Sequence, residues 1–180
     1  MKKTAKSIIN LVTWILVIAV VLLAVLLAGV RIIGFQPFAV LSGSMEPEFS
    51  VGDLIYVKKV DPYTLETGDV ITYMFSETTV STHRIAGIVP DETDPTVIRF
   101  RTKGDANDSE DGTLVHYKNV IGEPKFAIPL LGYVATYISA PPGMYVAIGC
   151  GALLLLMVFL PDFLDKEEDP KHGKYERLGE

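Results

Sequence analysis

The sequence predicts a mainly β fold, in which one small β domain lies between an N-terminal and a C-terminal transmembrane helix. Two observations support this prediction. The chain has two long apolar runs without charged residues, one towards each end. The region between them contains short stretches rich in β-branched and aromatic residues, each bounded by glycine, proline or aspartate. With 180 residues, the chain has room for one compact domain besides the two helices.

The first apolar run predicts a transmembrane helix over residues 8–30. At about 1.5 Å per residue, such a helix crosses a hydrocarbon core of about 30 Å. The run exceeds the roughly 7–15 apolar residues of a cleavable signal peptide, so an uncleaved anchor is favoured over that alternative. Three lysines precede the run and only Arg31 follows it closely, so residues 1–7 are expected in the cytoplasm.

The second apolar run predicts a transmembrane helix over residues 144–160, which is close to the lower limit of about 17 residues for a span. Pro142 just before the run is typical of a helix start, and Pro161 is expected to end the helix. Residues 161–180 then form a charged cytoplasmic tail, and residues 31–140 form a domain on the outer side of the membrane.

The intervening region has the composition of strands in three segments, residues 54–57, 70–75 and 96–100. Glycine-aspartate pairs beside them indicate turns. No stretch of about ten residues keeps a helical apolar period here. We therefore expect a small and predominantly β domain.

Composition and charge argue against several functions. The net charge of −6 and the lack of a basic run argue against nucleic-acid binding. The lone cysteine, Cys150, excludes an intramolecular disulfide. The histidines, His83, His116 and His172, lack the spacing of zinc ligands, so neither a metal nor a cofactor is expected.

One segment has the pattern of a nucleophile turn. An apolar, strand-like run ends at Ser42-Gly43-Ser44, and Pro47 then fixes the chain direction. Such a turn can expose the Ser44 hydroxyl and direct free backbone N–H groups towards a developing oxyanion. A serine in a turn more often bonds its own backbone, so this pattern alone does not identify an enzyme.

A serine hydroxyl needs a base, and His83 lies in a strand-like run later in the same region. His116 is a competing base, because nothing local separates the two histidines. The loop of residues 103–112 contains several acids, among them Asp105 and Asp111, and a carboxylate there can orient a histidine. A solvated loop or a calcium site is the alternative, although the spacing does not match an EF-hand.

Together these segments resemble the type I signal peptidases from about residue 8 to residue 137. The motifs occur in the family's order. The segment Ser42-Gly43-Ser44-Met45-Glu46-Pro47 resembles the Ser-x-Ser-Met-x-Pro box, and residues 53–57 and 67–71 resemble the strands that follow it. His83-Arg84-Ile85 occupies the place of Lys-Arg-Val, and Lys103-Gly104-Asp105 resembles the final box. A histidine in place of the lysine is similar to the branch with the endoplasmic-reticulum subunit, the archaeal enzymes and a minor Gram-positive type.

The resemblance implies that residues 31–140 form a signal-peptidase-like catalytic domain. It implies Ser44 as nucleophile, His83 as base, Asp111 as the acid, Asp105 as a supporting acid and Ser42 as a hydroxyl that assists the oxyanion hole. The implied activity is that of a membrane-bound serine endopeptidase, which removes signal peptides from exported preproteins by cutting after small residues. The implied partners are these preproteins and membrane lipid, with the translocon nearby.

The implied location is the cytoplasmic membrane, or the endoplasmic-reticulum membrane in a eukaryote, with two spans and the catalytic domain outside. Three alternatives remain open. Lys103 can be proposed as the base in place of His83. The chain can also be a non-catalytic, membrane-tethered β module, or a self-cleaving protease of the LexA-like kind.

Overall fold

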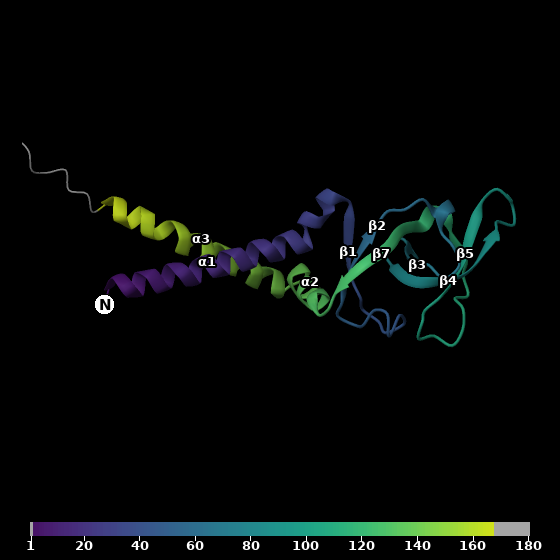
Figure 1. Cartoon of the computed structure of the whole chain (residues 1–180), viewed down its shortest axis with the longest axis horizontal. Coiled ribbons are helices and arrows are strands. Elements are labelled where there is room, and N and C mark those ends of the chain that lie inside the picture. The colour runs from purple at the N-terminus through teal and green to yellow at the C-terminus, as the bar shows by residue number, and fades with distance from the viewer. Residues whose placement is uncertain (1, 168–180) are drawn as a thin grey trace, which may run out of the picture.

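The computed structural model describes residues 2–167, which form an elongated molecule (Figure 1). A curled β domain occupies one end. Two long helices, α1 (Lys2–Leu27) and α3 (Gly143–Glu167), extend from the same side of this domain and contact each other. His172 and most of the predicted charged tail lie outside the described residues.

Helix α1 contains the predicted N-terminal span. Its window Asn10–Leu27 has a mean hydropathy of 2.8, and by length and composition α1 can cross a membrane by itself. The helix ends at Leu27, three residues before the predicted end, because the chain tightens into the 3-10 helix η1 (Gly29–Ile33). Gly34 then takes a left-handed conformation with φ of 87°, which glycine adopts without steric cost, and the chain enters the sheet.

The second apolar region is bent. Helix α2 (Leu131–Ser139) meets α3 at an angle of 93°, and within the described residues only the two together pass as a possible further span. Helix α2 was not expected, since its nine residues are too few to reveal a helical period. The prediction that Pro161 ends the second helix is wrong, because α3 continues to Glu167. The fixed φ angle of proline is close to that of a helix, so the backbone can continue through Pro161 at the cost of one hydrogen bond.

The β domain is one sheet of seven strands in the order β1-β2-β7-β3-β4-β5-β6, and every neighbouring pair is antiparallel. The prediction of a mainly β fold is confirmed. The strands are β1 (Phe35–Ala39), β2 (Leu54–Lys58), β3 (Val70–Met74), β4 (Val80–Pro90), β5 (Ile98–Lys103), β6 (Val115–His116) and β7 (Val120–Ile128).

Strand β7 joins the two halves of the sheet and was not predicted. Its later residues pair with β2, and its first residues pair with β3. Gly122 and Pro124 lie within it, and both residue types are depleted in strands. The pairing shifts register on both sides, next to Val57 and Tyr73, which is where a sheet bends most easily. This bend explains why the sheet curls around its core.

The core beneath β3, β4 and β5 positions the candidate site. Ile71, Tyr73, Ile85 and Phe100 are almost completely buried there. A second cluster, around Met45, Ile55 and Val57, lies beneath the turn that follows β1. A third cluster around Val30, Leu54 and Tyr56 connects the sheet to the helices, and the Tyr56 hydroxyl donates to the Leu26 carbonyl at 3.0 Å.

Candidate active site

Ser44 lies in the turn between β1 and β2, and the core fixes that turn from below. The side chain of the next residue, Met45, is only 2% exposed and packs in the second cluster. The Glu46 amide donates to the Gly43 carbonyl at 3.1 Å, and the Phe49 amide donates to the Met45 carbonyl at 3.0 Å. Burial of one side chain and two backbone hydrogen bonds therefore hold the serine at the surface of a rigid turn.

His83 reaches Ser44 from strand β4. Its Nε2 lies 3.2 Å from the Ser44 Oγ, and its Nδ1 lies 2.6 Å from the Asp111 Oδ2. Because a carboxylate accepts hydrogen bonds, the Nδ1 bears the hydrogen and the Nε2 has a free lone pair that faces the serine hydroxyl. The three side chains come from a turn, a strand and a loop that are far apart in the sequence, and they form one continuous relay.

The carboxylate of Asp111 is held in its ionised form. Burial alone would raise its pKa, but the hydrogen bonds from Thr102 and His83 outweigh this effect and hold the pKa below its ordinary value. The backbone contributes to the placement, since the Asp111 amide donates to the Thr102 carbonyl at 2.8 Å. Asp111 can therefore supply a fixed negative charge beside the imidazole.

Asp105 belongs to the same loop but faces a different partner. The Nε and Nη2 of Arg84 donate to its Oδ1 and Oδ2 at 2.8 and 2.6 Å. These hydrogen bonds lower the pKa of Asp105, and burial only partly opposes them. No hydrogen bond joins Asp105 to His83 among the described residues. Asp105 therefore anchors the loop to β4 beside the site.

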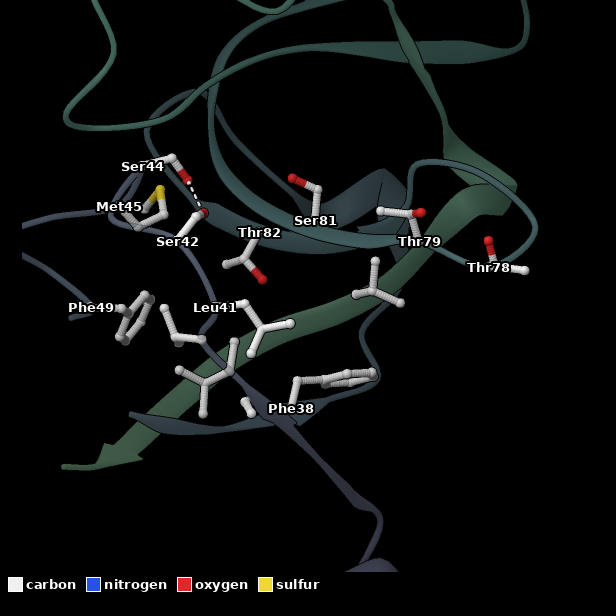
Figure 2. Close-up of a pocket in the computed structure, with 14 residues that line it drawn as sticks. Phe38, Leu41, Ser42, Ser44, Met45, Phe49, Thr78, Thr79, Ser81 and Thr82 are labelled. Carbon is white, nitrogen blue, oxygen red and sulfur yellow. Dashed lines mark hydrogen bonds between the residues drawn. The ribbon is translucent and has the colours of Figure 1, made fainter. Parts of the chain in front are cut away.

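The turn also offers donors for an oxyanion. The Ser42 Oγ lies 3.3 Å from the Ser44 Oγ, and Figure 2 shows the two hydroxyls facing each other. No hydrogen bond within residues 2–167 uses the N–H of Ser44. A free amide and a hydroxyl beside a nucleophile are the donors that stabilise a tetrahedral oxyanion.

A groove of about 470 Å³ leads to Ser44. One wall is the segment from Phe38 to Ser44, and the other is the start of β4 with the hairpin turn before it. In Figure 2, Ser42 and Ser44 lie at one end, with Phe38 and Leu41 on one side and Thr78 and Thr79 on the other. Strand residues of β1 and β4 form part of the two walls, so the groove suits an extended peptide.

Comparisons with known proteins identify the family of the chain. The family model described as signal peptidase, peptidase S26, matches residues 11–124. The chain belongs to the signal peptidase family. It is 44% identical over 90 residues to signal peptidase I W of Bacillus subtilis, covering 49% of this chain and 46% of the relative.

Two further relatives are catalytic subunits of signal peptidase complexes. Identity is 30% over 127 residues to SEC11C of Rattus norvegicus, which covers 65% of each chain. It is 33% over 130 residues to SEC11 of Lachancea thermotolerans, which covers 67% of this chain and 75% of the relative. The chain thus matches about half of the first relative's length and about two thirds of the second's.

The other candidate residues from the sequence lie apart from the relay. His116 is on β6, where its Nδ1 accepts a hydrogen bond from the Lys118 amide at 3.1 Å. Lys103 pairs in register with Arg84, the neighbour of His83, and paired strand residues project to the same face of a sheet. The Lys103 side chain therefore projects to the opposite face from His83. Within the described residues, no group of three or more His, Cys, Asp or Glu side chains is arranged to hold a metal ion, so nothing there supports a calcium site.

Sequence reasoning missed two residues of this candidate site. Tyr73 on β3 and Thr102 on β5 both donate to the Asp111 Oδ2, at 3.2 and 2.6 Å. Each lies in a predicted strand or beside one and has the composition of a core position. To identify them, one must know that their hydroxyls face Asp111. That depends on the strand register, which the sequence does not show.

Proposed function

We propose that this chain is a membrane-bound serine endopeptidase that removes signal peptides from exported preproteins. The observation that supports it best is the relay from the Ser44 hydroxyl through His83 to Asp111, with distances of 3.2 and 2.6 Å. Membership of the signal peptidase family and the names of the relatives support the same substrate class.

The relay has the geometry for acyl transfer. The Ser44 Oγ attacks the scissile carbonyl while the His83 Nε2 takes its proton. Asp111 keeps the imidazole in the required tautomer and stabilises the imidazolium that forms. His83 then gives the proton to the leaving amine, and afterwards it activates the water that hydrolyses the acyl-enzyme. Asp105 supports this arrangement indirectly, through Arg84.

The oxyanion of the tetrahedral intermediate is stabilised by the turn. The N–H of Ser44 is free within the described residues, and the Ser42 hydroxyl lies 3.3 Å from the attacking oxygen. The rigid turn fixes the Ser44 N–H before the substrate arrives, so little reorganisation of this donor is needed as charge develops.

The substrate binds in the groove as an extended strand. Backbone hydrogen bonds to the segment after β1 or to the start of β4 give affinity, and the space at Ser44 gives the preference for small residues before the cut. The membrane helices keep the enzyme where the apolar part of a signal peptide is also held, which raises the effective concentration of the two partners.

The membrane arrangement belongs to the proposal. Helix α1 crosses the bilayer with residues 1–7 in the cytoplasm, and residues 144–160 cross it again, so that residues 161–180 return to the cytoplasm. Residues 31–140 then form the catalytic domain on the outer side, with access to preproteins as they leave the translocon.

The test is cleavage of a labelled preprotein by the native protein in lipid or detergent, with Ser44→Ala and His83→Ala beside it. Ser109→Ala and His116→Ala are matched controls, because both residues lie outside the relay. Cleavage after a small residue that is lost in the first pair and kept in the second is the expected result. If the native protein cuts no preprotein, the tethered binding module is favoured. If cleavage survives His83→Ala, the Ser-His mechanism is wrong.

A further inference from the structure

One oxygen of Asp111 accepts hydrogen bonds from three different strands. The His83 Nδ1 on β4 lies 2.6 Å from the Oδ2, the Thr102 Oγ1 on β5 lies at 2.6 Å, and the Tyr73 hydroxyl on β3 lies at 3.2 Å. The two hydroxyls are themselves 3.2 Å apart. The acid of the relay therefore contacts the histidine and two neutral donors through a single atom.

These two donors are built into the core. Thr102 is fully buried and Tyr73 is 2% exposed. Burying a hydroxyl among apolar side chains is costly unless it has a hydrogen-bond partner, and here both hydroxyls have the same carboxylate as partner. Burial raises the pKa of the Tyr73 phenol, so it keeps the proton that it donates.

The register of the sheet explains why the two hydroxyls meet the acid beside the histidine. His83 pairs with Ile71, Tyr73 is two residues further along β3, and Thr102 pairs with Ile85, two residues after His83. Residues that pair, and residues two apart on one strand, project to the same face of a sheet. Tyr73, His83 and Thr102 therefore share one face, over which the loop places Asp111.

We propose that Tyr73 and Thr102 are positioning residues of this peptidase, which fix the Asp111 carboxylate against His83. This inference rests on the proposed function. Asp111 comes from a loop whose neighbours Asp108, Ser109, Glu110 and Gly112 are exposed. A carboxylate on such a loop can rotate towards solvent, and the two hydroxyls prevent this by holding its Oδ2 in place.

The two hydrogen bonds also lower the basicity of the Asp111 carboxylate. Two neutral donors spread the negative charge of the Asp111 Oδ2, and their loss leaves a more basic carboxylate next to the imidazole. The titratable Tyr73 contacts the acid directly, and Glu110 is the neighbour of that acid in the chain. Asp105 acts electrostatically on His83 and has Arg84 and Lys103 as its own charged neighbours, and all of these groups except Tyr73 are unchanged when a hydroxyl is substituted. A variant without one hydroxyl should therefore alter the pH profile as well as the rate.

The test compares Tyr73→Phe and Thr102→Val with a matched buried threonine. Thr72 is also fully buried, and its Oγ1 bonds Thr82 at 2.8 Å on the opposite face of the same sheet. Thr72→Val therefore loses a comparable buried hydrogen bond away from the acid. We expect kcat to fall about ten- to a hundredfold in the first two variants with little change in KM. The acid limb of the pH profile should move to higher pH, and Thr102→Ser should restore most of the rate.

A second readout does not depend on turnover. The proton on the His83 Nδ1 should give a far-downfield NMR resonance in the native protein, assigned by its loss in His83→Ala, and this resonance should shift or broaden in Tyr73→Phe and Thr102→Val but not in Thr72→Val. The inference is overturned if the rate, pH profile and resonance are unchanged, or if all three buried variants lose activity equally. If the native protein cleaves no preprotein, the proposed function fails, and the resonance still decides whether the two hydroxyls position the acid.

Discussion

The guanidinium of Arg84 donates to both carboxylate oxygens of Asp105, at 2.8 and 2.6 Å. The preceding residue of β4 is His83, whose imidazole contacts Asp111. The remaining Arg84 nitrogen, Nη1, donates to the Gly68 carbonyl at 2.9 Å. Two adjacent residues of β4 thus engage two acids of one loop. Since side chains alternate along a strand, the two contacts lie on opposite faces, and the loop is fastened on both sides of β4.

The two acids should therefore differ in their effect on catalysis. Asp111→Asn should lower kcat by about 10³- to 10⁴-fold, because an amide presents the wrong partner to the His83 Nδ1. Asp105→Asn should lower kcat much less and should mainly reduce the melting temperature, because it breaks the ion pair that anchors the loop. Steady-state kinetics and thermal unfolding of both variants check this, and equal losses of kcat would contradict it.

The Arg84–Asp105 pair should act as a unit. Arg84→Gln should be at least as harmful as Asp105→Asn, because it also loses the hydrogen bond to the Gly68 carbonyl. The double variant should be little worse than Arg84→Gln alone, because the second change removes a contact that is already lost. Additive losses in a double-mutant cycle would mean that the two side chains act separately.

Lys103 and His116 should be dispensable as bases. Lys103→Gln and His116→Ala should each retain kcat within about threefold and keep the native pH profile, because neither side chain lies in the relay. The acid limb of the native pH profile should therefore be retained in both variants. A limb that disappears in Lys103→Gln would instead favour a Ser-Lys mechanism.

Gly104 should be intolerant of a side chain. A Cβ there would lie 2.6 Å from the Ser44 carbonyl oxygen and 2.7 Å from the side-chain Nδ2 of Asn107, so the backbone of the nucleophile turn would have to move. A misplacement of about 1 Å can cost about a hundredfold in rate, so Gly104→Ala should lose most activity. Gly112→Ala, in the same loop with no atom within 4 Å of its Cβ, is the control and should remain active.

Stability should fall in acid partly through Asp91. Hydrogen bonds from the Thr93 hydroxyl and amide and from Arg99 hold the pKa of Asp91 far below its ordinary value, and burial opposes them only weakly. A carboxyl with a lower pKa in the folded state stabilises the fold above its unfolded pKa of about 3.9, and this contribution is lost as the pH falls towards the folded pKa. The melting temperature of the native protein should therefore drop between about pH 5 and pH 2 by more than that of Asp91→Asn. Asp108→Asn, an exposed position of another loop, should behave like the native protein.

The sequence alone determined the parts of this protein that depend on local composition. Apolar runs predicted α1 and most of α3, because the length and hydrophobicity of a membrane-spanning segment can be recognised without knowing its tertiary contacts. Segments rich in β-branched residues predicted β2, β3 and β5. The motif around Ser44 and the strand of His83 identified two members of the relay as candidates, since each lies in a short pattern of its own.

The tertiary structure decided what depends on contacts between distant segments. Strand β7 contains Gly122 and Pro124, and it is a strand because β2 and β3 both pair with it. Helix α2 is too short to show a period and is held by packing against the sheet. The sequence left Asp105 and Asp111 undistinguished because both lie in one loop, and only the fold shows that Asp111 contacts His83 while Asp105 contacts Arg84. The roles of Tyr73 and Thr102 depend on the strand register, which sets the face on which each side chain lies and is fixed only when the strands pair.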